Sequence, residues 1–131
     1  MSVRGIRGAI TASGNERETI VNATDRLLRE IVAANDVRAE DIAAVFFTTT
    51  ADLNAEFPAA AARALGWHKV PSLCAHEMGV PGQLSLCVRV LMLVNSNTAQ
   101  ADIKHVYLEG AMRLRPDLSG EADPETAGTT F

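Results

Sequence analysis

The chain of 131 residues carries 12 Lys and Arg against 16 Asp and Glu, a formal net charge of −4. A chain of this length fits one domain that buries about two thirds of its unfolded surface. Surfaces that bind nucleic acid combine a basic stripe with stacking aromatic rings, and this chain is acidic and only 5% aromatic. We therefore expect no nucleic acid partner.

The distribution of apolar and metal-ligating residues narrows the class of protein further. The beginning of the chain lacks the apolar stretch of a secretory signal, and the longest apolar run, about ten residues, is roughly half of what spans a bilayer as a helix. We therefore expect a cytoplasmic protein with no membrane partner. The chain has two cysteines, Cys74 and Cys87, which we expect to be reduced thiols. The three histidines are scattered, so we expect no metal site.

The first elements in chain order are a strand and a helix. Residues 3–10 predict a strand, in which Gly5 and Gly8 mark points where backbone or ligand could approach closely. Asn15, followed three residues later by Glu18, predicts the start of a helix. Apolar residues then recur at helical spacing until residues 35–36, where we expect the helix to end.

A second strand, a short helix and a third strand follow. Residues 42–50 are β-branched and aromatic enough to predict the second strand. Pro58 suits the first turn of a helix and Gly66 suits its end, which together predict a helix over residues 59–65. Residues 70–77 predict the third strand, with a proline near its beginning.

The run over residues 84–95 is ambiguous because it is apolar on every face. We predict a helix, since about 12 residues exceed the usual strand length, and an oligomer would cover its apolar surface. Residues 104–108 and 111–114 predict two further strands. The alternation predicts an α+β fold resembling α/β, a small mixed sheet with helices on one side, as one domain over residues 1–118. We expect residues 119–131 to form a polar, mobile tail.

Arg89 is the most informative single residue, because a guanidinium that stays charged at any ordinary pH lies inside an apolar run. Burying that charge without a partner costs several kcal/mol. The partner is either a carboxylate of this chain, in a structural ion pair, or an anionic ligand, and the residues leave both open. Glu77, at the end of a predicted strand, is the candidate carboxylate.

Several further guanidiniums lie near predicted strands and helices, at Arg7, Arg63, Arg113 and Arg115. Several arginines with one carboxylate suit the binding of a small polyanion better than hydrolysis. Position alone also permits a solvated strand face for Arg7 and a surface cation for Arg63. Both cysteines lie in apolar stretches, where a thiol more often packs than acts as a nucleophile.

Several blocks of sequence, which occur in order over residues 3–118, together form a recognisable pattern. They are RGIRGA at 4–9, ADLNAEFPA at 51–59, VP at 70–71 followed by Cys74 and Glu77, VRV at 88–90, HVYLE at 105–109 and LRPDL at 114–118. This set resembles the small monofunctional chorismate mutases of the trimeric pseudo-α/β-barrel class. The agreement of separate blocks in order and spacing makes the resemblance specific.

The resemblance implies the conversion of chorismate to prephenate, a unimolecular Claisen rearrangement in aromatic amino-acid biosynthesis that needs no nucleophile, proton transfer, metal or cofactor. It also implies a homotrimer with sites between subunits. By similarity, Arg89 would donate to the breaking ether oxygen, Glu77 would accept from the ring hydroxyl, and Arg7 would hold a carboxylate. Further substrate contacts would come from Tyr107, Cys74, Phe57, Ala59, Arg63 and Arg115.

Other functions remain compatible with the same residues. A trimeric binding module could sense an anionic aromatic or keto-acid metabolite without turnover, because ground-state and transition-state binding use the same residue types. A purely structural subunit could hold Arg89 and Glu77 as an internal salt bridge. Phe57 could be a packing residue, and Tyr107 could be a strand residue with a satisfied hydroxyl.

Overall fold

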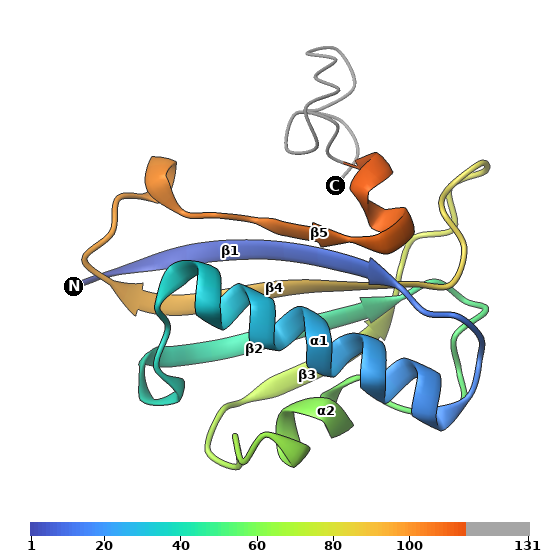
Figure 1. Ribbon diagram of the computed structural model, residues 1–131, viewed down its shortest axis with the longest axis horizontal. Helices are drawn as coiled ribbons and strands as arrows, with labels where there is room; N and C mark the ends of the chain where they lie inside the picture. Colours follow the sequence, from blue (N-terminus) through green and yellow to red (C-terminus); the bar gives the residue numbers. More distant parts are fainter. Residues whose placement is uncertain (115–131) are drawn as a thin grey trace.

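The computed structural model describes residues 1–114 (Figure 1). In chain order its helices and strands are β1 (Ser2–Thr11), α1 (Arg17–Asn35), β2 (Ile42–Thr49), α2 (Ala59–Ala64), β3 (Ser72–His76), β4 (Cys87–Ser96) and β5 (Val106–Leu108). Three short 3-10 helices complete this part of the chain: η1 (Ala39–Asp41), η2 (Gln100–Asp102) and η3 (Glu109–Leu114).

The strands of this region form one mixed sheet in the order β3-β2-β4-β1-β5. β4 runs antiparallel to both of its neighbours, β1 and β2, whereas the outer pairs β2/β3 and β1/β5 are parallel. The predicted α+β class is confirmed. The strands predicted at 3–10, 42–50, 70–77 and 104–108 are present, with ends that differ by at most two residues.

Helix α1 lies across one face of the sheet and closes the main core (Figure 1). Its buried residues recur every three or four positions, at Ile20, Thr24, Leu27, Leu28 and Ile31. Gly8 allows this approach: a Cβ there would lie 2.8 Å from Cδ1 of Ile31 and 3.1 Å from the carbonyl oxygen of Val106. The close approach anticipated at Gly8 is therefore made by the helix and by a neighbouring strand.

Within residues 1–114, the opposite face of the sheet is covered only at one end. There η3 and β5 pack on Ala9 and Cys87 in a small cluster that also contains Tyr107, Ala111 and Leu114. Farther along the same face, the side chains of Phe46, Leu73 and Leu91 are exposed, Leu73 to 62%. Phe46 is the cross-strand neighbour of both Leu73 and Leu91, so these three form a continuous apolar surface.

The helix predicted over residues 84–95 is wrong, because this run is β4, the central strand of the sheet. One set of alternate residues is buried in the main core, at Val88, Val90, Met92 and Val94. The other set, which includes Arg89 and Leu91, points to the opposite face. A central strand with apolar residues on both faces gives a continuous apolar run, which periodicity alone cannot distinguish from a buried helix.

Two smaller predictions also differ from the structure. Residues 111–114 lie in η3 and not in a strand; Glu109, at the end of β5, has a φ of 53°, which turns the chain out of the sheet. Helix α1 is capped by Glu16 in a capping box with Thr19, and not by Asn15. The Asn15 side chain instead accepts hydrogen bonds from the backbone N–H groups of the 54–55 loop.

The helix ends confirm the remaining predictions on local structure. Asp36 caps α1 in a left-handed conformation, and Gly66 follows α2 with a φ of 85°. Within residues 1–114, no helix combines the length and the hydropathy that a membrane crossing requires. The predicted tail at 119–131 and the predicted contact residue Arg115 lie outside the described residues.

Candidate active site

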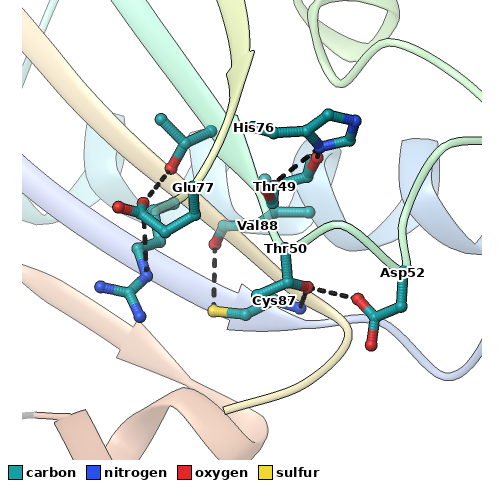
Figure 2. Close-up of polar contacts among 9 residues, drawn as sticks. Thr49, Thr50, Asp52, His76, Glu77, Cys87 and Val88 are labelled. Carbon is teal, nitrogen blue, oxygen red and sulfur yellow. Dashed lines mark hydrogen bonds and ion pairs between the residues drawn. The ribbon is translucent and has the colours of Figure 1, made fainter. Parts of the chain in front are cut away.

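The site is centred on Arg89, which β4 presents on the face of the sheet opposite α1. The side chain is largely buried, with the residue 9% exposed, and its Nε lies 3.8 Å from Oε2 of Glu77. Glu77 follows directly after β3, where its backbone N–H donates to the carbonyl oxygen of Thr49 over 2.7 Å. The predicted pairing of Arg89 with Glu77 is confirmed (Figure 2).

A threonine hydroxyl completes the surroundings of the Glu77 carboxylate. Thr48 donates to Oε2 of Glu77 over 2.6 Å, and Thr48 is also the cross-strand neighbour of Arg89. The same carboxylate oxygen therefore faces a hydroxyl donor and a guanidinium. No sequence motif marks Thr48, because its closeness to Glu77 follows only from the parallel pairing of β2 with β3.

Arg89 and Glu77 line a cavity of about 670 Å³. Its other walls are the loop over residues 78–85 and, from η3, Arg113 and Leu114. A volume of this order accommodates a small metabolite. The ion pair and the cavity coexist, so the two partners that the sequence left open for Arg89 are compatible. The guanidiniums of Arg89 and Arg113 both line this cavity, which favours an anionic ligand.

Arg7 and Tyr107 lie on the same face of the sheet as Arg89. Ala9 is the neighbour of Arg89 on one side and of Tyr107 on the other, so β1 separates these two side chains by one strand. Arg7 lies two residues before Ala9 in β1, which by strand alternation places it on the same face. The structure thus gathers the predicted residues Arg7, Glu77, Arg89 and Tyr107 on this face.

Two further predicted residues line a second, smaller cavity of about 300 Å³. Phe57 and Cys74 line it, and Phe57 is 65% exposed. Its other lining residues come from the ends of β2 and β3 and from the intervening loop, at Thr49, Leu53, Asn54, Ala55, Glu56, Pro58, Ala75 and His76.

The two cavities meet at the end of β3 but belong to different faces of the sheet. His76 lines the smaller cavity and Glu77 the larger one, and the two side chains point apart (Figure 2). These two consecutive residues therefore face opposite sides and do not form an acid–base pair. A single chain therefore separates Phe57 and Cys74 from Arg89.

Burial favours the protonated thiol at both cysteines. Burial raises the pKa of the Cys74 thiol, and a backbone hydrogen bond with Ala59 and the charge of Arg63 oppose that rise. Burial likewise raises the pKa of the Cys87 thiol against the effect of Arg89. Neither cysteine is a thiolate nucleophile at neutral pH. The interactions at Cys74 also place Ala59 and Arg63 of α2 beside the smaller cavity.

Comparison with known proteins gives the family. Residues 3–118 match the family described as chorismate mutase type I. The chain is 52% identical over 117 residues to the chorismate mutase AroH of Thermus thermophilus, covering 88% of this chain and 96% of that protein. It is 46% identical over 120 residues to the chorismate mutase AroH of Bacillus subtilis (strain 168), covering 91% of this chain and 94% of that protein.

The chain belongs to the chorismate mutase type I family.

A solved structure of a chorismate mutase from Clostridium thermocellum superposes with a TM-score of 0.83 at 47% identity, covering 84% of this chain and 98% of that one. The protein is thus an enzyme, a chorismate mutase, and the resemblance found in the sequence blocks is confirmed. Among residues 1–114, no three His, Cys, Asp or Glu side chains gather as they would around a metal ion.

Proposed function

We propose that this chorismate mutase converts chorismate to prephenate in sites that two neighbouring subunits of a homotrimer build together. One subunit contributes the residues around the larger cavity, Arg7, Glu77, Arg89 and Tyr107. Its neighbour contributes the residues around the smaller cavity, Phe57, Ala59, Arg63 and Cys74. The observation that carries the proposal is the buried Arg89 guanidinium, which faces Glu77 inside a cavity large enough for the substrate.

The reaction asks little covalent chemistry of the protein. A carbon–oxygen ether bond breaks while a carbon–carbon bond forms in the same molecule, and no group is transferred to the enzyme. The protein holds the substrate in its compact conformation and stabilises the charge that develops on the ether oxygen. The absence of a nucleophilic cysteine thiolate is consistent with this reaction.

The proposal assigns each residue its contacts with the substrate. Arg89 donates to the breaking ether oxygen and to the enolpyruvyl carboxylate, where its low-dielectric surroundings strengthen the interaction. Arg7 holds the same carboxylate together with the Tyr107 hydroxyl. Glu77 accepts a hydrogen bond from the ring hydroxyl. The neighbour supplies an apolar wall from Phe57 and Ala59 and further contacts from Cys74. Its Arg63 places a cation at the mouth of the site. Arg115, which lies beyond the described residues, would also contact the substrate.

The uncovered face of the sheet supports the trimer. Phe46, Leu73 and Leu91 form a continuous exposed apolar surface, which in a soluble enzyme marks a protein interface. That surface lies on the same face as Arg89, so a subunit seated on it also approaches the larger cavity. The exposure of Phe57 is relieved in the same way if it reaches into a neighbour's site. A cytoplasmic location belongs to this proposal, because two free cysteines suit a reducing compartment.

Complementation between two inactive variants tests the shared site. Arg89→Gln disables one half and Arg63→Gln the other, and the two chains are unfolded together and refolded as mixed trimers. About one quarter of the wild-type activity should return, because a site works only when each variant supplies its intact half. Activity is followed as the loss of chorismate's ultraviolet absorbance.

The matched control combines Arg89→Gln with Glu77→Gln, whose defects lie in the same half. No mixed site then contains both intact residues, and the mixture should remain as inactive as its components. Equal behaviour of the two mixtures would overturn the shared site. Saturable binding of chorismate to the wild-type protein without turnover would instead support a binding module.

A further inference from the structure

Asp52, in the loop after β2, accepts hydrogen bonds from the backbone N–H of Leu86, the residue just before β4. The N–H of Leu86 donates to both of its carboxylate oxygens, over 3.1 Å to Oδ1 and 3.0 Å to Oδ2. The Thr50 hydroxyl donates to Oδ1 of the same carboxylate (Figure 2). Asp52 therefore accepts from a residue 34 positions later in the chain and joins two segments that approach the site from different directions.

Thr50 extends this connection by one residue. Its hydroxyl accepts from the N–H of Cys87 over 3.0 Å, and its own N–H donates to the carbonyl oxygen of Cys87 over 3.0 Å. Two consecutive backbone N–H groups, those of Leu86 and Cys87, are thus held by the side chains of Asp52 and Thr50. The beginning of β4 is fixed by side chains as well as by its strand partners.

Leu86 needs such a restraint because its backbone is in the left-handed region, with a φ of 52°. A leucine pays a steric cost there that glycine does not, so the surrounding contacts must hold it. On the other side of the residue, the carbonyl oxygen of Leu86 accepts from the N–H of Ala12 over 2.8 Å. The turn at Leu86 is therefore pinned at both of its backbone polar groups.

This turn separates two parts of the site. Residues 78–85, which precede it, line the larger cavity, and Arg89 lies three residues after it. We propose that Asp52, assisted by Thr50, is a positioning residue of this enzyme that holds Leu86 in its left-handed turn and so sets the 78–85 wall against Arg89. Asp52 acts through the backbone, since the cavity wall itself is made by other residues. The inference rests on the proposed role of Arg89.

The test separates positioning from general stability by rescue at Leu86. Asp52→Ala should lower kcat at least tenfold, with a smaller change in KM, because the wall and Arg89 lose their mutual alignment. Leu86→Gly added to Asp52→Ala should restore kcat to within about fivefold of wild type, because glycine adopts the left-handed turn without the carboxylate. Melting temperature should nevertheless fall further in the double variant, since a glycine removes the leucine's packing and adds backbone freedom.

Three controls define the outcomes. Leu86→Gly alone should keep kcat within about threefold of wild type, and Asp25→Ala, which breaks a surface ion pair of α1, should leave kcat unchanged. If kcat follows the melting temperature, so that the double variant is the least active, the positioning role is wrong. If Arg89→Gln is inactive and Asp52→Ala fully active, this inference fails alone. A fully active Arg89→Gln would overturn the proposed function instead.

Discussion

The Thr48 hydroxyl donates to the same oxygen of Glu77, Oε2, that faces the Arg89 guanidinium, over 2.6 Å. One carboxylate oxygen is thus held between a neutral and a charged donor. A carboxylate held in this way has a fixed orientation before substrate arrives, which lowers the cost of aligning it in the transition state. We therefore expect Thr48 to contribute to activity, although no sequence motif marks it.

Removing the Thr48 hydroxyl should therefore reduce activity. Thr48→Val keeps the shape of the side chain, and we expect kcat/KM to fall about tenfold, the usual scale for a hydrogen bond to a charged group. Thr48→Ser retains the donor and should stay within about threefold of wild type. Thr24→Val is the matched control, because it deletes a buried hydroxyl of α1 far from the cavity. Equal losses in the two valine variants would assign the effect to folding.

Neutralising Arg89 should have the largest effect of any single substitution. Arg89→Gln removes the charged donor from a buried position, and we expect kcat to fall by at least about 10²–10³, the range for a lost transition-state donor. Steady-state kinetics with chorismate measure the loss, and thermal unfolding checks that the variant is folded. Near-normal turnover by a folded Arg89→Gln enzyme would refute the role assigned to this residue.

The buried Cys87 thiol should make stability depend on alkaline pH. Burial raises its pKa in the folded state, so the unfolded chain releases this proton at a lower pH. The folded state then holds more protons above about pH 8.5, and the free energy of unfolding falls as pH rises, by at most about 1.4 kcal/mol per pH unit. Urea unfolding at about pH 8 and about pH 10 measures the change.

Cys87→Ala supplies the reference for that measurement, because every other titrating group is shared. The difference in unfolding free energy between wild type and Cys87→Ala should move in favour of the variant as pH increases. A difference that stays constant, or that moves in favour of the wild type, would show that this thiol has no raised pKa.

Gly8 should tolerate no side chain, because α1 and β5 approach it too closely. A Cβ at this position would lie 2.8 Å from Ile31 Cδ1 and 3.1 Å from a backbone oxygen, so Gly8→Ala should destabilise the protein by about 1–3 kcal/mol. Gly5→Ala is the control, since its Cβ would make an ordinary 3.6 Å contact with Leu91. Urea unfolding at one protein concentration compares them, and equal stabilities would contradict the packing argument.

Local signals predicted most of the elements, and their failure at β4 has a physical cause. Strand β2 could be identified because β-branched and aromatic residues are concentrated in it, and α1 because its buried residues repeat at helical spacing. β4 lies between two strands and carries apolar residues toward both faces, so its residues show no clean alternation. The sequence signal that favoured a strand was the presence of two β-branched residues, Val88 and Val90, on either side of Arg89.

The site was predicted unevenly for a similar reason. Arg89 and Glu77 could be paired because a charge in an apolar run requires a partner, and the sequence blocks supplied the family. Thr48 and Asp52 carried no such sign, since their contacts with Glu77 and Leu86 depend on strand register and on a left-handed turn. Contacts made through register cannot be obtained from the spacing of residues along one segment.

In the proposed trimer, the face of the sheet that carries Phe46 and Leu91 also affects how the enzyme regains activity after denaturation. Helix α1 covers the other face within one molecule, at a rate that does not depend on protein concentration. The face with Phe46 and Leu91 would be covered only when subunits associate. Recovery after dilution from urea should therefore be second order at its slow step, and halving the protein concentration should about double the half-time of reactivation.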